Sequence, residues 1–437
     1  MRRKLSTLEH IISGNIVLFV RLEGSFAPEQ FRSALERVQR KHPALRALIR
    51  EERGRLYYEE DSAPEIPLRV LPRKAEDDYR REAELELNHE FAYDQPQLRA
   101  VWLYSELGGD FLLTTSHRIC DGGSMLTLMR ETLQAVYSDE ELVPYRPITI
   151  QDIIGNYQPP RLWQRRLAAS VINGFIRLIP GSYPPKHNHK FYLEWMADRD
   201  LSAALTKRCN AEGVSVHAAF VVLLDRAFLA VCEKKKAPAS IHTQMDIRGR
   251  RKNFSMLRRG MLFFAGGAVK TQTGQYADMD FWSRARMIHQ EMPGQIEQEL
   301  QQIPGRCHLF EMLRPPTGRQ LNTLAWLGQM FKGIGAGNAF MLANMGSVVP
   351  SSVDAPFRVT ALRPFMHSSK AAVIGLSAYK FRGELYFYYV GDEKQQSRIV
   401  AEALKHEFMA ALQRLVSDGS HTVEISANQP QADMVEV

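Results

Sequence analysis

Cysteine is scarce in this sequence. The 437 residues include only Cys120, Cys209, Cys232 and Cys307, and their spacing fits neither paired metal ligands nor a disulfide framework. We therefore expect free thiols, which are typical of a reducing compartment, and we expect no metal site. The pair His187 and His189 has no matched carboxylate or cysteine nearby, so a surface loop is the better interpretation there.

Long apolar runs are also missing. No stretch of about 18 or more uncharged apolar residues occurs, and this argues against a membrane-spanning helix. The basic segment Met1 to Ser6 is not followed by a signal-type apolar run before Glu9 and His10, as a secretory leader would require. These two observations predict a cytoplasmic protein.

Neither sign of charge dominates the composition. Fifty-six basic and 49 acidic residues give a net charge of +7, and the calculated pI is near 9.1. Such a modest excess fits a partner that carries phosphates, such as coenzyme A, or an acidic carrier protein. No basic helix with interleaved aromatics stands out, so we do not expect a nucleic-acid partner.

Helical and strand patterns alternate along the first part of the chain. Apolar spacing predicts helices over 28–42, 75–90 and 124–137, and strands over 45–49, 56–58, 98–104 and 111–115. This alternation indicates an α/β fold with helices layered on a sheet. The later part repeats the pattern, with strands expected over 191–195, 240–245, 371–378 and 384–390 and helices over 200–212, 216–232 and 396–416.

Proline pairs mark a break between the two parts. Pro159-Pro160, Pro180-Gly181 and Pro184-Pro185 interrupt residues 155–190, as expected of a crossover. We therefore divide the chain into a first half, 1–155, a linker, 156–189, a second half, 190–420, and a flexible polar tail, 421–437.

An amphipathic helix is expected within the linker, from Arg161 to Ile179. Its apolar residues fall broadly on one face, and arginines are interspersed among them. Two interpretations are open: a basic helix that rests on a membrane surface, or a linker helix packed on its own protein. We favour the second.

The motif with the clearest chemistry follows the strand 111–115. It reads Ser116-His117-Arg118-Ile119-Cys120-Asp121-Gly122-Gly123. A histidine at a strand end, followed by glycines that allow a sharp turn, is held rigidly. A neutral imidazole in that position can accept a proton from a hydroxyl, amine or thiol near neutral pH. Cys120 could be interpreted as a nucleophile, but a buried filler on the turning loop is favoured.

The H-x-x-x-D-G pattern resembles the active-site signature of the chloramphenicol acetyltransferase-like superfamily. This group includes condensation domains, polyketide-associated acyltransferases, alcohol acetyltransferases and wax ester synthases. Further segments resemble it in the same order along the chain. They are Leu5-Ser6-Thr7-Leu8-Glu9, Arg40 to Ala47, Phe91 with Pro96, Leu98 and Arg99, Gly213 to His217, Met245-Asp246-Ile247-Arg248, and Ala343-Asn344-Met345-Gly346.

Two departures narrow the resemblance. Condensation domains usually have two adjacent histidines, and here Ser116 replaces the first. The plant-type marker D-F-G-W-G is missing, which argues against that branch.

The resemblance implies two acetyltransferase-like halves, each a mixed sheet covered by helices, with a tunnel at their junction. His117 would be the general base, and Asp121 would pair with Arg248 across the halves in a structural role. Asn344 is a candidate oxyanion donor or, alternatively, a turn residue before Gly346. Gly122 would keep the tunnel open or, alternatively, allow a turn with positive φ.

Two surface features complete the expectations. Arg250, Arg251 and Lys252, with Arg258 and Arg259 beyond them, could bind coenzyme A or phosphopantetheine phosphates, or simply form a solvated loop. The apolar residues 324–342 form either a lid at a tunnel mouth or ordinary core.

By this resemblance we expect an O-acyltransferase that uses an acyl thioester of coenzyme A or a carrier protein as co-substrate and needs no other cofactor. The alternatives are amide-forming condensation on carrier-bound substrates and an inactive acyl-binding scaffold.

Overall fold

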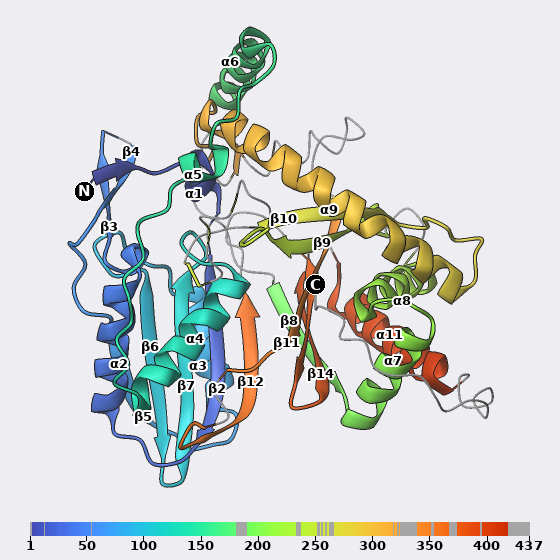
Figure 1. Ribbon diagram of the computed structural model, residues 1–437, viewed down its shortest axis with the longest axis horizontal. Helices are drawn as coiled ribbons and strands as arrows, with labels where there is room; N and C mark the ends of the chain where they lie inside the picture. The colour runs from blue at the N-terminus through green and yellow to red at the C-terminus, as the bar shows by residue number, and fades with distance from the viewer. Residues whose placement is uncertain are drawn as a thin grey trace.

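The computed structural model shows two halves, each a sheet with covering helices, side by side (Figure 1). This confirms the expected α/β fold. The residues described are 2–12, 14–53, 55–180, 190–232, 237–250, 254, 257, 260–261, 266–317, 319–320, 323, 339–350, 354–366, 374–393 and 396–417.

The first half contains a five-stranded sheet in the order β12-β2-β7-β6-β5. Its strands are β2 (Asn15–Glu23), β5 (Leu68–Pro72), β6 (Leu98–Ser105), β7 (Gly108–Ser116) and β12 (Arg358–Met366). Helices α2 (Pro28–Lys41) and α4 (Gly122–Tyr137) pack on one face, and α3 (Asp78–Asn88) packs on the other.

Strand β2 shows why both faces are covered. Leu18 and Val20 point to the cluster that α2 and α4 complete. Their neighbours Val17 and Phe19 point to the α3 side, where Phe19 stacks on Tyr79 with ring centroids 4.1 Å apart. Side chains alternate along a strand, so a run that is apolar throughout buries both faces of the sheet.

A smaller three-stranded sheet lies beside this half, in the order β1-β4-β3. It consists of β1 (Arg2–Lys4), β3 (Leu48–Glu52) and β4 (Arg55–Glu59). The short helix α1 (Thr7–Ile11) follows β1 along the chain. The strand expected from residue 45 begins at Leu48, because Pro43–Leu45 form a 3₁₀ turn first.

The second half contains a six-stranded sheet in the order β10-β9-β11-β13-β14-β8. Its strands are β8 (Lys190–Ala197), β9 (Ser240–Asp246), β10 (Gly266–Gln272), β11 (Ala339–Ser347), β13 (Gly375–Phe381) and β14 (Glu384–Asp392). Helices α7 (Arg199–Ala211), α8 (Val216–Val231) and α11 (Arg398–Ser417) share its core. Helix α8 is apolar on nearly every side and largely buried, as such a composition requires.

Two elements tie the halves together. Strand β12 comes late in the chain, yet it pairs antiparallel with β2 of the first sheet. Helix α9 (Phe281–Glu311) contacts α1 and α5 (Ile150–Ile154) of the first half and α8 of the second (Figure 1). Residue 190 therefore marks where the second sheet starts along the chain, but the later chain also contributes a strand to the first sheet.

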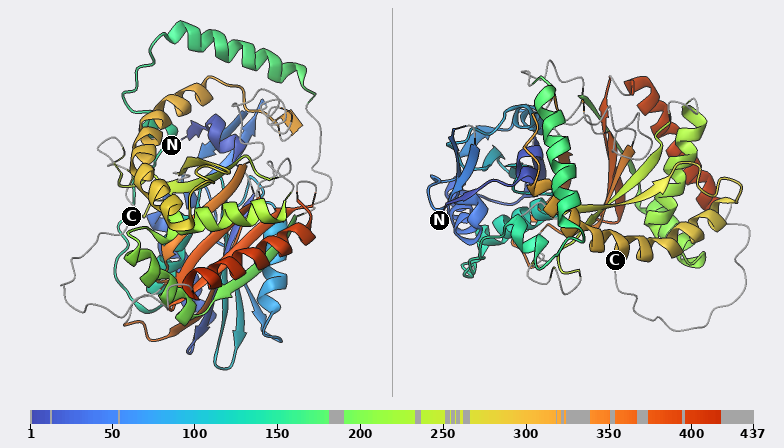
Figure 2. Two further views of the ribbon diagram at one scale, coloured as in Figure 1. Left: turned by 90° about the vertical axis from the view of Figure 1, so that its right-hand side faces the viewer. Right: turned by 90° about the horizontal axis from the view of Figure 1, so that it is seen from above.

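Helix α6 (Leu162–Leu178) packs on its own protein through one side, as favoured, because Ala169 and Ile176 are buried. Its other side is apolar but exposed, at Trp163, Leu167, Val171, Phe175 and Leu178. The views in Figure 2 show α6 on the outside of the molecule, beyond α9.

Within the part of the chain that the structure describes, no single helix has the length and apolar composition needed to cross a membrane. The one pair that meets the test jointly, α7 with α8, is bent by 105°.

Candidate functional site

His117 lies one residue beyond the end of β7, where two contacts fix its position. Its backbone N–H donates to the carbonyl of Gly14 at 2.9 Å. Its Nδ1 lies 2.8 Å from the carbonyl oxygen of Cys120. A carbonyl only accepts, so Nδ1 carries the proton of the neutral ring. The basic nitrogen is therefore Nε2, as a proton-accepting histidine requires.

Burial controls the protonation of His117. Desolvation disfavours the imidazolium and is the largest influence, so the pKa of His117 lies below its ordinary value of 6.5. The Cys120 carbonyl and the Asp121 carboxylate favour the charged form, but they do not outweigh burial. The ring is consequently neutral near pH 7 and able to act as a base.

Asp121 holds the other end of the loop. It is the N-cap of α4: its Oδ1 accepts from the backbone N–H of Ser124 and from the Ser124 hydroxyl, both at 2.9 Å. An aspartate in this position satisfies one of the unpaired N–H groups that begin a helix. The carboxylate therefore fixes where the loop ends and α4 begins.

Arg248 comes from the second half and completes this arrangement. Its Nη1 donates to Asp121 Oδ2 at 2.9 Å and to Asp246 Oδ1 at 3.0 Å. Its Nη2 donates to the Ser124 hydroxyl at 2.7 Å, and its Nε donates to the carbonyl of Met261 at 3.0 Å. The structure thus brings Asp121 and Arg248 together across the two halves, as the resemblance implies.

The environment keeps this guanidinium charged. Burial disfavours the charge, but Asp121 and Asp246 outweigh it, and the pKa of Arg248 is raised above its ordinary value. The side chain is almost fully buried. A buried charge that is this completely hydrogen-bonded positions the loop firmly, and it is costly to leave unpaired.

Arg118 braces the loop from a third direction. Its Nε donates to the backbone carbonyl of Glu9 at 2.8 Å. Glu9 itself forms a capping box with Ser6 at the start of α1 and accepts two hydrogen bonds from Arg3. The segment 5–9, which resembles the family's opening, therefore supports the His117 loop through Arg118.

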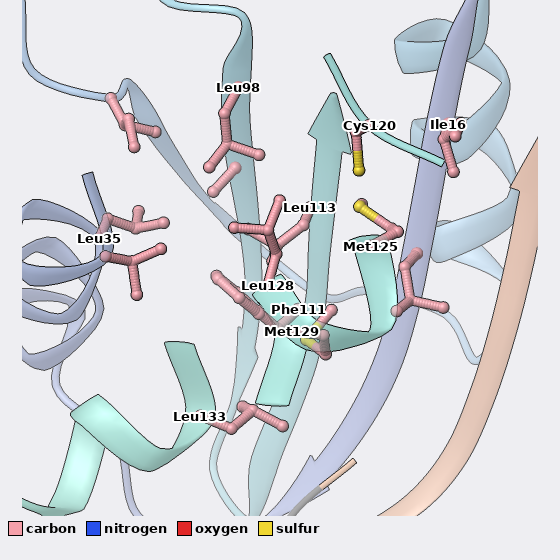
Figure 3. Close-up of a cluster of buried hydrophobic side chains, with 14 of the residues drawn as sticks. Ile16, Leu35, Leu98, Phe111, Leu113, Cys120, Met125, Leu128, Met129 and Leu133 are labelled. Carbon is pink, nitrogen blue, oxygen red and sulfur yellow. The ribbon is translucent and has the colours of Figure 1, made fainter. Parts of the chain in front are cut away.

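Cys120 is a packing residue. Its side chain is fully buried and lies in the apolar cluster with Ile16 and Met125 (Figure 3). Burial raises the pKa of its thiol well above the ordinary value. A nucleophilic cysteine needs a stable thiolate, so the buried-filler interpretation holds.

Gly122 lies close to Met345, the neighbour of Asn344 in the other half. A Cβ built on Gly122 would meet only Met345 Sδ, at 3.9 Å, and Met345 follows Asn344 in β11. Gly122 is the first residue of α4 and has no positive φ, so the turn explanation for this glycine is wrong. The Oδ1 of Asn344 accepts from the N–H of Gly346 at 3.1 Å. Asn344 therefore does act as a turn residue. Because Oδ1 is used in the turn, Nδ2 is the side-chain atom of Asn344 that could donate to a substrate.

Several other candidates are placed only in part. Arg250 is half-buried, just after the turn at Gly249. Arg251, Lys252, Arg258 and Arg259 lie outside the described residues, as do His187, His189 and residues 324–338. A cavity of about 50 Å³ is lined by Arg118 and Ile119 of the His117 loop. A larger groove of about 990 Å³ runs along α3 of the first half. His117 lines neither of them, so the tunnel stays a prediction.

Three residues of the site were missed by sequence reasoning. Ser124 and Arg118 hold the His117 loop, and Asp246 holds Arg248, the residue that pairs with Asp121. The D-x-x-S spacing of an N-cap could have indicated Ser124. Asp246 lies two residues before its partner Arg248, inside the segment Met245 to Arg248 that resembles the family, so that segment could have indicated it. Nothing local distinguishes Arg118, because its partner Glu9 lies far away in the sequence.

Comparison with known proteins identifies the family of the chain. The condensation-domain family matches residues 5–253, more than half of the chain. A curated relative, the probable non-canonical nonribosomal peptide synthetase CymA of Salinispora arenicola (strain CNS-205), is 30% identical over 159 residues. That match spans 35% of this chain and 2% of the much longer relative.

Solved structures share the fold at low sequence identity. The condensation domain of the monacolin K polyketide synthase MokA is 12% identical with a TM-score of 0.66, covering 96% of this chain and 98% of that one. Polyketide synthase associated protein 5 from Mycobacterium tuberculosis is 12% identical with a TM-score of 0.63, covering 94% and 98%. The condensation enzyme VibH is 16% identical with a TM-score of 0.62, covering 95% and 93%.

The family match, the shared two-half fold and the braced His117 loop lead to one conclusion. This chain belongs to the condensation-domain family.

Proposed function

We propose that the protein is an acyltransferase that moves an acyl group from a thioester to a hydroxyl acceptor, with His117 as the general base. The observation that carries the proposal is the contact between Nδ1 and the Cys120 carbonyl. It leaves Nε2 as the basic nitrogen of a ring whose pKa is lowered. Such a group can take the acceptor's proton at neutral pH.

In the reaction, Nε2 accepts the hydroxyl proton as the oxygen attacks the thioester carbonyl. A carbon–oxygen bond forms, and the tetrahedral intermediate then expels the thiolate. The thiolate takes the proton held on Nε2 and leaves as free thiol, which returns His117 to its neutral form. The Nδ2 of Asn344 is our candidate donor to the intermediate's oxyanion. Both substrates would reach His117 through a passage at the junction of the halves, where alignment supplies much of the rate.

The thioester is carried by coenzyme A or by a carrier protein. We propose that Arg250, with Arg251 and Lys252, contacts its phosphates, since guanidinium and ammonium groups bind phosphate well. No further cofactor is part of this chemistry.

Amide formation is the second candidate, and the family match supports it. The matching family is named for condensation. The resemblance to condensation domains implies substrates that are bound to carrier proteins. The chemistry at His117 would be the same, with an amine in place of the hydroxyl.

The test is release of free thiol from acyl-coenzyme A and from a loaded carrier protein, with a panel of alcohols and amines. His117→Ala should lower turnover by about 10²–10⁴-fold, the range for loss of a general base. His89→Ala is the matched control, because His89 is an exposed histidine of the same half.

The outcomes separate the candidates. Equal turnover in wild type and His117→Ala would remove His117 from the mechanism. Thiol release only with amines, or only from the loaded carrier, would favour condensation. No thiol release from any donor, with acyl compounds still bound, would indicate a scaffold.

A further inference from the structure

Helix α6 presents an apolar stripe to solvent. Trp163, Leu167, Val171, Phe175 and Leu178 are between 42% and 81% exposed. They are spaced by three or four residues, so they line one side of the helix. Among the described residues, five of the fifteen exposed large hydrophobic side chains lie on this single helix. Concentrated exposure of this kind marks a contact surface.

The opposite side of α6 holds the stripe in this orientation. Ala169 and Ile176 are buried on that side. Arg165 Nη1 donates to the Gly305 carbonyl at 2.9 Å, and Asn173 Nδ2 donates to the Met312 carbonyl at 3.0 Å. The end of the helix is also tied, because Gln320 Nε2 donates to the carbonyls of Ile176 and Ile179, both at 2.9 Å. The stripe cannot turn inward without breaking these bonds.

The charge around the stripe is of one sign. Arg161, Arg166 and Arg177 are exposed on α6 or at its start, and no acidic residue occurs between Asp152 and the end of the helix. Arg314 and Arg319, in the segment that contacts the helix, are exposed as well. The occupant of this surface must therefore be apolar where it meets the stripe and anionic at its margins.

We propose that α6 is a membrane-contact helix that lies in the plane of an anionic lipid bilayer. The helix is an outer ridge of the molecule (Figure 2), and its stripe runs from Trp163 to Leu178, nearly its full length. A ridge fits a fluid surface without needing a complementary groove. Tryptophan, phenylalanine and leucine on one side with arginine at the margins is the pattern of an interfacial helix.

The experiment uses the full-length protein and vesicles of phosphatidylcholine with or without 25% phosphatidylglycerol, followed by flotation. We expect wild type to bind the anionic vesicles and to lose binding as salt rises. Leu167→Gln with Val171→Gln should weaken binding about tenfold or more, since two apolar side chains leave the bilayer. Arg166→Gln with Arg177→Gln should weaken it about fivefold per charge on anionic vesicles only.

Two controls keep the result specific. Ile399→Gln changes an aliphatic residue that is more exposed than Leu167 or Val171, 82% exposed on α11, and should bind as wild type does. Trp163 should shift its emission to the blue on anionic vesicles, and Trp163→Phe should abolish that shift while the other tryptophans remain.

Three results would overturn the proposal. The first is equal vesicle binding by wild type and by the Leu167 and Val171 variant. The second is a wild-type dimer, seen by light scattering, that this variant dissociates while no vesicle binding occurs; the occupant is then a second copy. The third is binding only to an acidic carrier protein, which would assign the ridge to a protein partner.

Discussion

The loop after β7 is held by a buried arginine of the second half, whereas helix α6 exposes arginines of its own. Arg248 is buried at the loop and directs its donors to Asp121, Asp246, Ser124 and Met261. Exposed Arg166 and Arg177 of α6 surround an apolar stripe that has no cover in the described chain. The loop is held from both halves, whereas α6 is held on one side only. The comparison indicates that the loop is built for fixed geometry and α6 for contact with something outside the chain.

The largest test of this difference is Asp121→Ala. The substitution leaves Arg248 charged and buried with one partner fewer, and it removes the cap of α4. We expect the free energy of unfolding, measured with urea, to fall by about 3–5 kcal/mol. We also expect activity, measured as thiol release, to be lost. Asp121→Asn keeps a side-chain oxygen for the cap and should lose less. An Asp121→Ala variant that folds cooperatively but is inactive would show that Asp121 has a direct catalytic role instead.

Ser124→Ala tests the same network more gently. The Ser124 hydroxyl accepts from Arg248 Nη2 and donates to Asp121 Oδ1, so its removal takes one acceptor from the buried guanidinium and one donor from the carboxylate. We expect about 1–3 kcal/mol of destabilisation by urea unfolding. Ser170→Ala on the exposed surface of α6 is the matched control and should stay within about 0.5 kcal/mol of wild type. Equal effects at the two serines would contradict the contrast between the regions.

The pH profile tests the protonation of the loop. Burial lowers the pKa of His117 below 6.5, and the base works only when unprotonated. The midpoint of the acid limb of kcat/KM should therefore lie below pH 6.5. Below the lowered pKa, the rate should fall about tenfold per pH unit, equivalent to about 1.4 kcal/mol. An acid limb above pH 6.5 would mean that the neighbouring Asp121 carboxylate dominates instead of burial.

The smallest effect is expected on the stability of α6 variants. Leu167 and Val171 are exposed, so replacing either with glutamine should change the unfolding free energy by no more than about 0.5 kcal/mol. A loss of 2 kcal/mol or more at one of these positions would require the side chain to be buried in solution. That result would mean that the apolar stripe itself packs against the protein.

Much of the fold could be predicted from local patterns. The helices over 28–41 and 216–231 and the strand over 98–105 match their expected ranges closely, because their apolar spacing is regular and their ends are capped or broken. Helix α9 was missed, since Pro293 and Pro304 lie inside it and proline usually ends a helix. Strand β12 was missed because its partner β2 lies more than 300 residues earlier.

The candidate site could also be predicted only in part from the sequence. The motif identified His117, Asp121 and Gly122, and the resemblance identified Arg248 and Asn344. The contacts of Arg248 with Asp121 and Ser124, and of Arg118 with the backbone of Glu9, join residues from distant segments. No pattern within a single segment could specify them.

The sequence by itself determined the α/β alternation, the strand that ends at His117 and the amphipathic character of residues 161–179, because each depends on neighbours only a few positions apart. Tertiary structure alone decided which nitrogen of His117 is basic, how Arg248 joins the two halves and which side of α6 faces out. These three properties depend on burial and on contacts between distant segments, and local periodicity contains no information about either.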